Sequence, residues 1–164
     1  MKVIGEEGFI TSALTSLIVA FISIITAILV ITPAAYTFSR FKFWGRDTIL
    51  FMYLMLSQIG GGFWVAAIIA LYVFLLKLQT MGLPTLGNPF LLSIIYVAEG
   101  VPFQTWLLKS YFDSIPKAHD EAAFIDGASW GQIIFKIVLP SSKPAVIVVA
   151  IFAFMGAWGE FILA

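Results

Sequence analysis

The chain has 164 residues, of which 61% are hydrophobic and only 11% are charged, and its mean hydropathy is +1.03. Soluble domains carry about 25% charged residues, so this chain lacks the charge to cover a water-facing surface and is predicted to be an integral membrane protein. The lack of cysteine excludes disulfides and Cys-ligated metal. The net charge of zero says little about nucleic acid, but the sequence has no basic patch that would track phosphates, so nucleic acid is not expected as a partner.

The first apolar run is long enough to cross a lipid bilayer. It extends over residues 14–38 without a charged side chain, and a bilayer core of about 30 Å needs about 20 helical residues. Residues 39–47 follow as a short loop with three cations, and it contains the aromatic residues Phe41, Phe43 and Trp44. Cations together with interfacial aromatic side chains indicate a cytoplasmic boundary.

Three further apolar runs predict three further spans. The second run, at 48–76, is too long for one straight span, and three glycines at 60–62 interrupt it. This helix is therefore either tilted or broken at the glycines. The third and fourth runs are about 90–109 and 145–164. The sequence thus predicts one transmembrane domain over residues 1–164, an all-α polytopic bundle with about four spans.

The distribution of cations predicts the orientation of the bundle. Four spans place the segments 39–47 and 109–144 on the same side, and these segments hold seven of the nine Lys and Arg residues. Cytoplasmic loops of membrane proteins carry an excess of such cations. We therefore expect a multi-pass protein of the cell membrane with the loop at 113–144 in the cytoplasm.

This cytoplasmic loop is predicted to contain two short helices. Pro116 favours a helix start, and Asp126-Gly127 predicts its end, since glycine can adopt the left-handed conformation that follows a helix. Ser129 and Gln132 have the spacing of a capping box at the start of the second helix. Small side chains in the first helix leave a surface that another protein can approach closely, although an ordinary amphipathic connector is the alternative.

A spaced motif runs through the loop. Glu121-Ala-Ala-x-x-x-Gly127 is followed, after nine residues, by Ile137-x-Leu139-Pro140. This motif resembles the EAA loop in the permease subunits of ATP-binding-cassette importers, with every anchor in register. Such a resemblance implies the type I importer permease fold.

Three further stretches are similar to the carbohydrate-importing branch of this family, specifically to the second permease of the maltose type. They are residues 106–116, residues 126–129 and Trp158-Gly-Glu-Phe161. Family permeases have about six spans, so the chain is expected to be truncated at both ends. His119-Asp120 departs from the pattern usual in this branch.

The resemblance implies that the loop is a coupling element, which sits in a cleft of an ATPase subunit and transmits nucleotide-driven closure to the spans. The implied partners are a cytoplasmic ATP-binding-cassette ATPase dimer, a second homologous permease, an extracytoplasmic sugar-binding protein and the sugar itself. The implied docking residues are the motif positions Glu121, Ala122, Ala123, Gly127, Ile137, Leu139 and Pro140, together with Asp126, which precedes Gly127.

Two acidic residues in the predicted spans are candidates for a translocation path. A charged group inside a bilayer costs about 2.5–3.5 kcal/mol on insertion scales, so it is expected to face the bundle interior or water. Pro102, close to Glu99, is expected to open the helix. We hypothesise that the path is lined by Glu99, Gln104, Trp158 and Glu160, with carboxylates accepting sugar hydroxyl groups and the indole stacking on a sugar face. An interhelical hydrogen bond or an interfacial position is the alternative, and it is favoured for Glu160.

Enzyme chemistry is not indicated by the sequence. There is no G-x-x-x-x-G-K-[ST] motif for nucleotide phosphates, so a partner must handle ATP. The single histidine, His119, has no Cys or second His with which to bind metal, and no cofactor is predicted. The alternatives are an ion-coupled carrier or channel that uses Glu99 as a proton site, a membrane assembly subunit without a path, and a permease for another solute such as glycerol phosphate or peptide.

Overall fold

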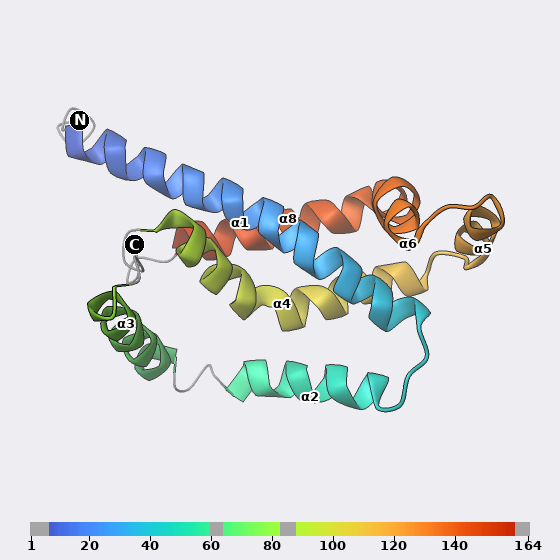
Figure 1. Ribbon diagram of the computed structural model, residues 1–164, viewed down its shortest axis with the longest axis horizontal. Helices are drawn as coiled ribbons and strands as arrows, with labels where there is room; N and C mark the ends of the chain where they lie inside the picture. The colour runs from blue at the N-terminus through green and yellow to red at the C-terminus, as the bar shows by residue number, and fades with distance from the viewer. Residues whose placement is uncertain (1–6, 60–63, 83–87, 160–164) are drawn as a thin grey trace.

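The computed structural model describes residues 7–59, 64–82 and 88–159, and Figure 1 shows a bundle of helices. Its longer helices are α1 (Glu7–Arg40), α2 (Arg46–Ile59), α3 (Trp64–Thr80), α4 (Pro89–Asp113) and α8 (Lys143–Gly159). Between α4 and α8 lie α5 (Ala118–Ile125), α6 (Trp130–Gln132), the π-helix η3 (Ile133–Val138) and α7 (Leu139–Ser141). No strand occurs in the described residues, and the predicted all-α class is confirmed.

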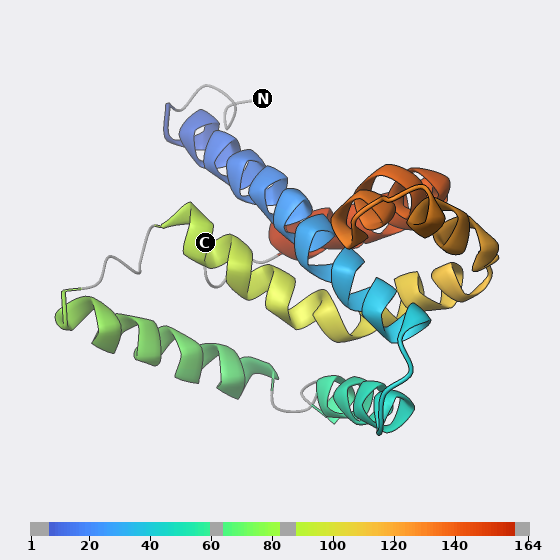
Figure 2. The same cartoon turned by 45° about the vertical axis from the view of Figure 1, so that its right-hand side comes forward.

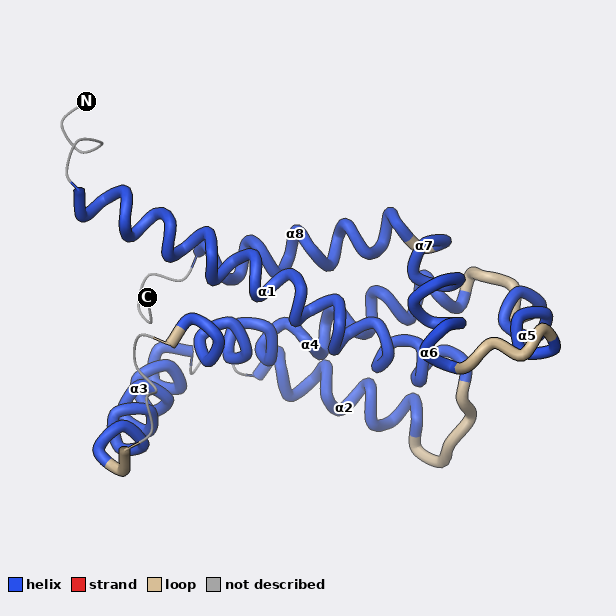
Figure 3. Tube along the Cα trace, turned by 45° about the horizontal axis from the view of Figure 1, so that its top comes forward, coloured by secondary structure: helices blue, strands red, loops and turns tan. Residues whose placement is uncertain are grey.

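The helices α1, α4 and α8 form the centre of the bundle and pack against one another (Figure 3). Two hydrogen bonds show that α1 and α4 run in the same direction. Near one end the Ser93 hydroxyl donates to the carbonyl oxygen of Val19, at 3.1 Å. Near the other end the Ser39 hydroxyl donates to Oδ1 of Asp113, at 2.7 Å. Each pair is 74 positions apart, so the helices keep one register over about 30 Å at 1.5 Å per residue.

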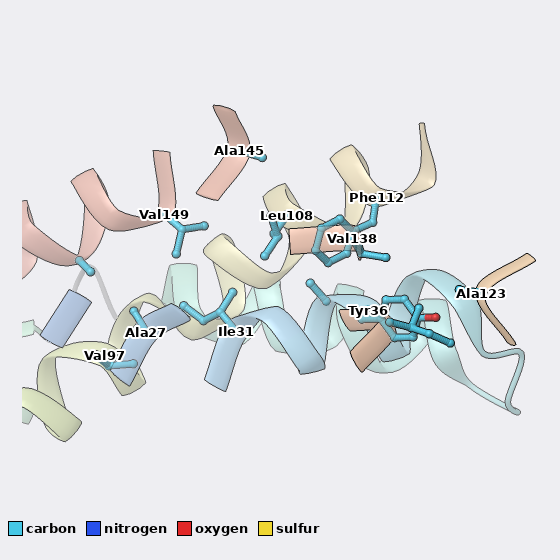
Figure 4. Packing of buried hydrophobic residues seen from close by; sticks show 13 residues of the cluster. Ala27, Ile31, Tyr36, Val97, Leu108, Phe112, Ala123, Val138, Ala145 and Val149 are labelled. Atoms are coloured by element: carbon cyan, nitrogen blue, oxygen red, sulfur yellow. The ribbon is translucent and has the colours of Figure 1, made fainter. Parts of the chain in front are cut away.

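Small side chains line the contacts among these three helices. On α8 the buried positions recur every fourth residue, at Ala145, Val149, Ala153 and Ala157. Ala27 on α1 is fully buried opposite this stripe, in the cluster that Figure 4 shows. Helices in membranes associate through such small residues, because the backbones can then approach closely where the hydrophobic effect gives little help.

Two of the predicted spans correspond to single long helices. Among the described residues, Ser12–Arg40 and Pro89–Asp113 are each long and apolar enough to cross a membrane. The pair Trp130–Ser141 and Lys143–Gly159 meets the same criterion as a helix bent by 91°. Much of the apolar surface of these helices faces outward, which fits contact with lipid or with another membrane subunit.

The second apolar run does not form one straight helix. Residues 48–76 are divided between α2 and α3, which point in different directions in Figures 1 and 2. At about 21 Å for its 14 residues, α2 is too short to cross a bilayer core by itself. The glycines at 60–62 lie outside the described residues. The fourth predicted span begins in α8, and its end at 160–164 also lies outside them.

Candidate docking loop and transmembrane residues

The first helix of the loop ends in a specific backbone motif. Asp126 caps α5, and Gly127 follows with a φ of +81°. The amide of Gly127 donates to the carbonyl oxygen of Phe124 at 3.1 Å, and the amide of Ala128 donates to that of Ala123 at 3.0 Å. These two bonds define a Schellman motif, in which glycine tolerates the left-handed conformation. The predicted end of the helix is confirmed. Its start is two residues later than Pro116, which precedes the capping residue.

The second helix begins with the predicted capping box. The amide of Gln132 donates to the Ser129 hydroxyl at 3.4 Å, and the amide of Ser129 donates to the Gln132 side-chain oxygen at 2.9 Å. The chain continues through η3 and α7 and then bends by 91° into α8. Two capped helices and a sharp bend therefore hold the loop in one shape at the end of the bundle where α1 ends (Figure 2).

The expected docking residues divide into an exposed group and a packed group. The packed group consists of Ala123, which is buried in the main core, and of Ile137 and Leu139, which are partly covered. These residues hold the loop against the bundle. The exposed group is available to a partner, and its members are Glu121, Ala122, Asp126, Gly127 and Pro140.

A buried ion pair connects the loop to α1. Nε of Arg40 donates to Oδ2 of Asp120 at 2.5 Å, and the side chains of the two residues are only 6% and 10% exposed. The Tyr36 hydroxyl donates to the same oxygen at 3.3 Å. Nη2 of Arg40 also donates to the carbonyl oxygen of Ile115, at 3.2 Å. Sequence reasoning missed this pair, because it treated Arg40 only as an indicator of orientation and Asp120 only as a departure from the family pattern.

Aromatic side chains reinforce this attachment. The ring of Trp130 on α6 lies 5.0 Å from that of Phe124 on α5, 5.1 Å from that of Phe41 and 6.5 Å from that of Tyr36, measured between centroids. A hollow of about 480 Å³ lies beside this group. Its lining residues are Tyr36, Arg40, Lys117, Asp120, Glu121, Phe124, Ile125 and Trp130.

Two of the proposed path residues, Glu99 and Gln104, lie on different sides of α4. Glu99 is exposed, whereas Gln104 is buried, and five residues of helix place their side chains about 140° apart around α4. The Gln104 amide lies over Gly100, and its side-chain oxygen has no hydrogen-bond partner in the described part of the chain. Trp158 is half-exposed and its ring stacks on that of Phe154 at 5.6 Å.

The helix that carries Glu99 and Gln104 is continuous. Pro102 does not open α4, which continues through it to Asp113, so that expectation was wrong. Neighbouring helices can satisfy the carbonyl that a proline leaves free in a membrane helix. Glu160 lies outside the described residues.

Within those residues, no three His, Asp or Glu side chains lie where they could hold a metal ion.

Comparisons with known proteins show which family and which relatives the chain resembles. Residues 27–164 match the family described as "Binding-protein-dependent transport system inner membrane component". The chain is 36% identical to the maltodextrin transport system permease protein MdxG of Bacillus subtilis, over 99% of this chain and 55% of the relative. It is 39% identical to the galactooligosaccharides transport system permease protein GanQ of the same organism, over 97% and 54% of the two chains.

A solved structure has the same fold. It is the crystal structure of a bacterial ABC transporter involved in the import of the acidic polysaccharide alginate, and the similarity has a TM-score of 0.74 with 26% sequence identity. The match covers 97% of this chain and 52% of the other. The chain thus spans about half the length of the proteins that it matches. By the match over residues 27–164, this membrane protein belongs to the family of binding-protein-dependent transport system inner membrane components.

Proposed function

We propose that this chain forms part of the membrane-spanning subunit of an ATP-driven carbohydrate importer. The observation that carries the proposal is the loop between α4 and α8, in which the EAA-type motif is held in one shape by a Schellman motif and a capping box and presents an exposed face. Family membership supports a transport role, and the names of the similar permeases support a carbohydrate as the substrate. The chain itself is a transporter component, and a partner hydrolyses ATP.

The exposed face of α5 is the proposed contact with a cytoplasmic ATP-binding-cassette ATPase, which acts as a dimer. Ala122 on this face and Gly127 in the turn after the helix are exposed and lack bulk, so the partner can approach closely, while Glu121 and Asp126 offer carboxylates to its donors. The cations in 39–47 and 109–144 support a cytoplasmic location for the loop. A second homologous permease and an extracytoplasmic sugar-binding protein complete the proposed assembly.

The proposed mechanism is alternating access. ATP binds more tightly to the closed ATPase dimer than to the open one, and this difference shifts the population of the transporter from one state to the other. The loop carries the shift to the helices because it is rigidly folded and is continuous with α4 on one side and with α8 on the other. An ion-coupled carrier takes its energy from an ion gradient, so it needs no ATPase and no docking loop of this kind.

The proposed substrate is an oligosaccharide of the maltose or trehalose type. A similar permease of Thermococcus litoralis, 36% identical over 91% of this chain, is named for trehalose/maltose transport. Carboxylates and amides can form hydrogen bonds with the hydroxyl groups of a sugar, and aromatic side chains can stack on its apolar ring faces. The candidates in this chain are Glu99, Gln104 and Trp158, with Glu160 as a fourth from the sequence.

Co-purification with candidate importer ATPases tests the docking role, using wild type, Gly127→Trp and Gly82→Trp. Gly127 and Gly82 both have a positive φ, and a Cβ added at either meets no atom within 4 Å. Both substitutions therefore cost the same backbone strain, about 1–2 kcal/mol. Only Gly127 lies in the loop.

Loss of the ATPase in Gly127→Trp with retention in Gly82→Trp is the expected result. Retention of the ATPase in both variants would exclude the proposed contact. If wild-type protein that is well folded binds no importer ATPase, the proposed class of transporter is wrong.

A further inference from the structure

Of the three helices at the centre of the bundle, α1 alone has no short covalent connection to the loop. Asp113 at the end of α4 is followed within a few residues by α5, and α7 leads directly into α8. The chain between Arg40 at the end of α1 and Ala118 at the start of α5 includes α2, α3 and α4. A displacement of α5 therefore reaches α4 and α8 through the backbone, whereas it must reach α1 through side chains.

The contacts between α5 and α1 are few and directional. α5 packs along η3 and not along α1. Its polar connection to α1 is made at Asp120, whose Oδ2 accepts from Nε of Arg40 and from the hydroxyl of Tyr36. Burial of these groups strengthens the bonds, because water and salt do not compete for them as they do at a surface.

We propose that Asp120, Arg40 and Tyr36 form the link that makes α1 move together with the docking helix, and that they are positioning residues for coupling. This inference rests on the proposed function of the loop. Apolar contacts resist compression but slide under tension, whereas a charge-assisted hydrogen bond also resists being pulled apart. The link therefore transmits movement of α5 in both directions.

The geometry lets this link survive small movements of α5. Oδ1 of Asp120 is buried without a hydrogen-bond partner in the described structure. The guanidinium has five N–H donors in a planar fork, and a carboxylate can accept at both oxygens. Nη2 lies on the same edge of the guanidinium as Nε and carries two hydrogens, of which the carbonyl of Ile115 accepts one. A rotation of α5 that brings Oδ1 of Asp120 to the other hydrogen can add a second bond without breaking the first, so the pair can follow a displacement.

The decisive variant is the double substitution Arg40→Met/Asp120→Leu, studied in the full permease with its ATPase and partner permease in proteoliposomes. Replacement of a buried ion pair by apolar residues of similar size is often neutral for stability. If the pair serves only folding, this variant transports as wild type does. If it is the link, the variant assembles with the ATPase but moves about tenfold less substrate per ATP hydrolysed, within the range usual for coupling between sites.

Two single substitutions complete the set. Tyr36→Phe keeps the ring contacts and removes one of the two hydrogen bonds that Oδ2 of Asp120 accepts, so a smaller loss of substrate moved per ATP is expected, about threefold and thus just below the range usual for coupling between whole sites. This variant decides the question if the double variant does not assemble. Lys109→Gln is the matched control, because it removes an ion pair of 2.7 Å that lies within α4 and joins no two elements. It should couple normally.

A spectroscopic measurement separates coupling from stability. The chain has no cysteine, so spin labels can be placed on Cys residues introduced at exposed sites such as Leu17 on α1, Ile94 on α4 and Met155 on α8. In wild type we expect the distances from Met155 to Leu17 and to Ile94 to respond together when an ATP analogue is added. In Arg40→Met/Asp120→Leu only the distance to Ile94 should respond normally.

The outcomes distinguish the two proposals. Normal transport per ATP in the double variant, or an unchanged response of Leu17, overturns the link while the docking role of the loop stands. Failure of the wild-type assembly to bind any ATPase overturns the proposed function itself. Unchanged transport per ATP in Tyr36→Phe counts against the link in the same way.

Discussion

Ser39 at the end of α1 donates its hydroxyl hydrogen to Oδ1 of Asp113 at the end of α4, at 2.7 Å. The other carboxylate oxygen of Asp113 accepts from Nζ of Lys109, also at 2.7 Å. The Ser39 side chain is buried and binds a charged acceptor, so this bond fixes the register of the two parallel helices at the loop end of the bundle.

Removal of this hydroxyl should lower the stability of the bundle. Ser39→Ala deletes one hydrogen bond to a charged group, and such bonds contribute about 1.5–3 kcal/mol. Because Asp113 is partly exposed and can bind water instead, we expect a loss of about 1–2 kcal/mol in the free energy of unfolding. Ser110→Ala is the matched control, since that exposed hydroxyl binds only the carbonyl of Trp106 in its own helix. Denaturant unfolding in detergent measures the free energy of unfolding of both variants. Equal values for Ser39→Ala and Ser110→Ala would contradict this prediction.

Gly100 in α4 leaves space that the side chain of Gln104 occupies. A Cβ at position 100 would collide with the end of the Gln104 side chain, which is buried. Gly100→Ala should therefore destabilise by about 1 kcal/mol, the low end of the range for overpacking, because the amide must move. In Gly156→Ala the new methyl group meets nothing within 4 Å, and the better helix propensity of alanine should give a neutral or slightly stabilising change.

The collision can be tested by a second substitution. Gln104→Ala in the Gly100→Ala background removes the side chain that the methyl group meets, so the cost of Gly100→Ala should vanish there. Thermal unfolding of wild type, Gly100→Ala, Gln104→Ala and the double variant gives the coupling energy between the two positions directly. Equal costs of Gly100→Ala with and without Gln104 would show that the close approach has no energetic consequence.

Trp130 should hold the docking loop in place. Its ring contacts those of Phe124, Phe41 and Tyr36 at 5.0–6.5 Å, and aromatic pairs contribute about 0.5–1.5 kcal/mol each beyond burial. Trp130→Ala should raise amide hydrogen exchange in α5 by about tenfold or more, since loss of 1.4 kcal/mol of local stability changes an opening equilibrium tenfold. Trp44→Ala is the control, because Trp44 is 98% exposed. Equal exchange in both variants would contradict the role of Trp130.

Features that depend on neighbouring residues were predictable from the sequence. The end of α5 follows from Gly127 and the start of α6 from Ser129 and Gln132, because capping rules act over three or four positions. The α1 and α4 spans follow from the length of their apolar runs. The family resemblance rested on the spacing of a motif, and the comparison over residues 27–164 supports it.

Features that depend on residues far apart were not predictable. Arg40 and Asp120 are 80 positions apart, and only the parallel packing of α1 and α4 brings the loop back to the end of α1. The continuity of α4 through Pro102 was missed for a related reason, because a propensity rule for isolated helices does not include the neighbours that support a proline in a membrane bundle. For the run at 48–76 the sequence left a tilted and a broken helix open, and only the structure shows that α2 and α3 are separate helices with different directions (Figure 1).

Two adjacent alanines should separate the folding of the loop from its docking. Ala122 is exposed on α5, whereas Ala123 is buried in the core. Ala123→Leu forces extra volume into a packed site and should cost about 1–3 kcal/mol of stability. Ala122→Leu adds the same volume to the proposed docking face, so it should leave thermal stability unchanged while it weakens co-purification with the ATPase. Ala122 lies on the face of α5, whereas Gly127 lies in the Schellman turn after the helix. If Ala122→Leu binds the ATPase as tightly as wild type while Gly127→Trp does not, the contact must therefore centre on the turn and not on the helix face.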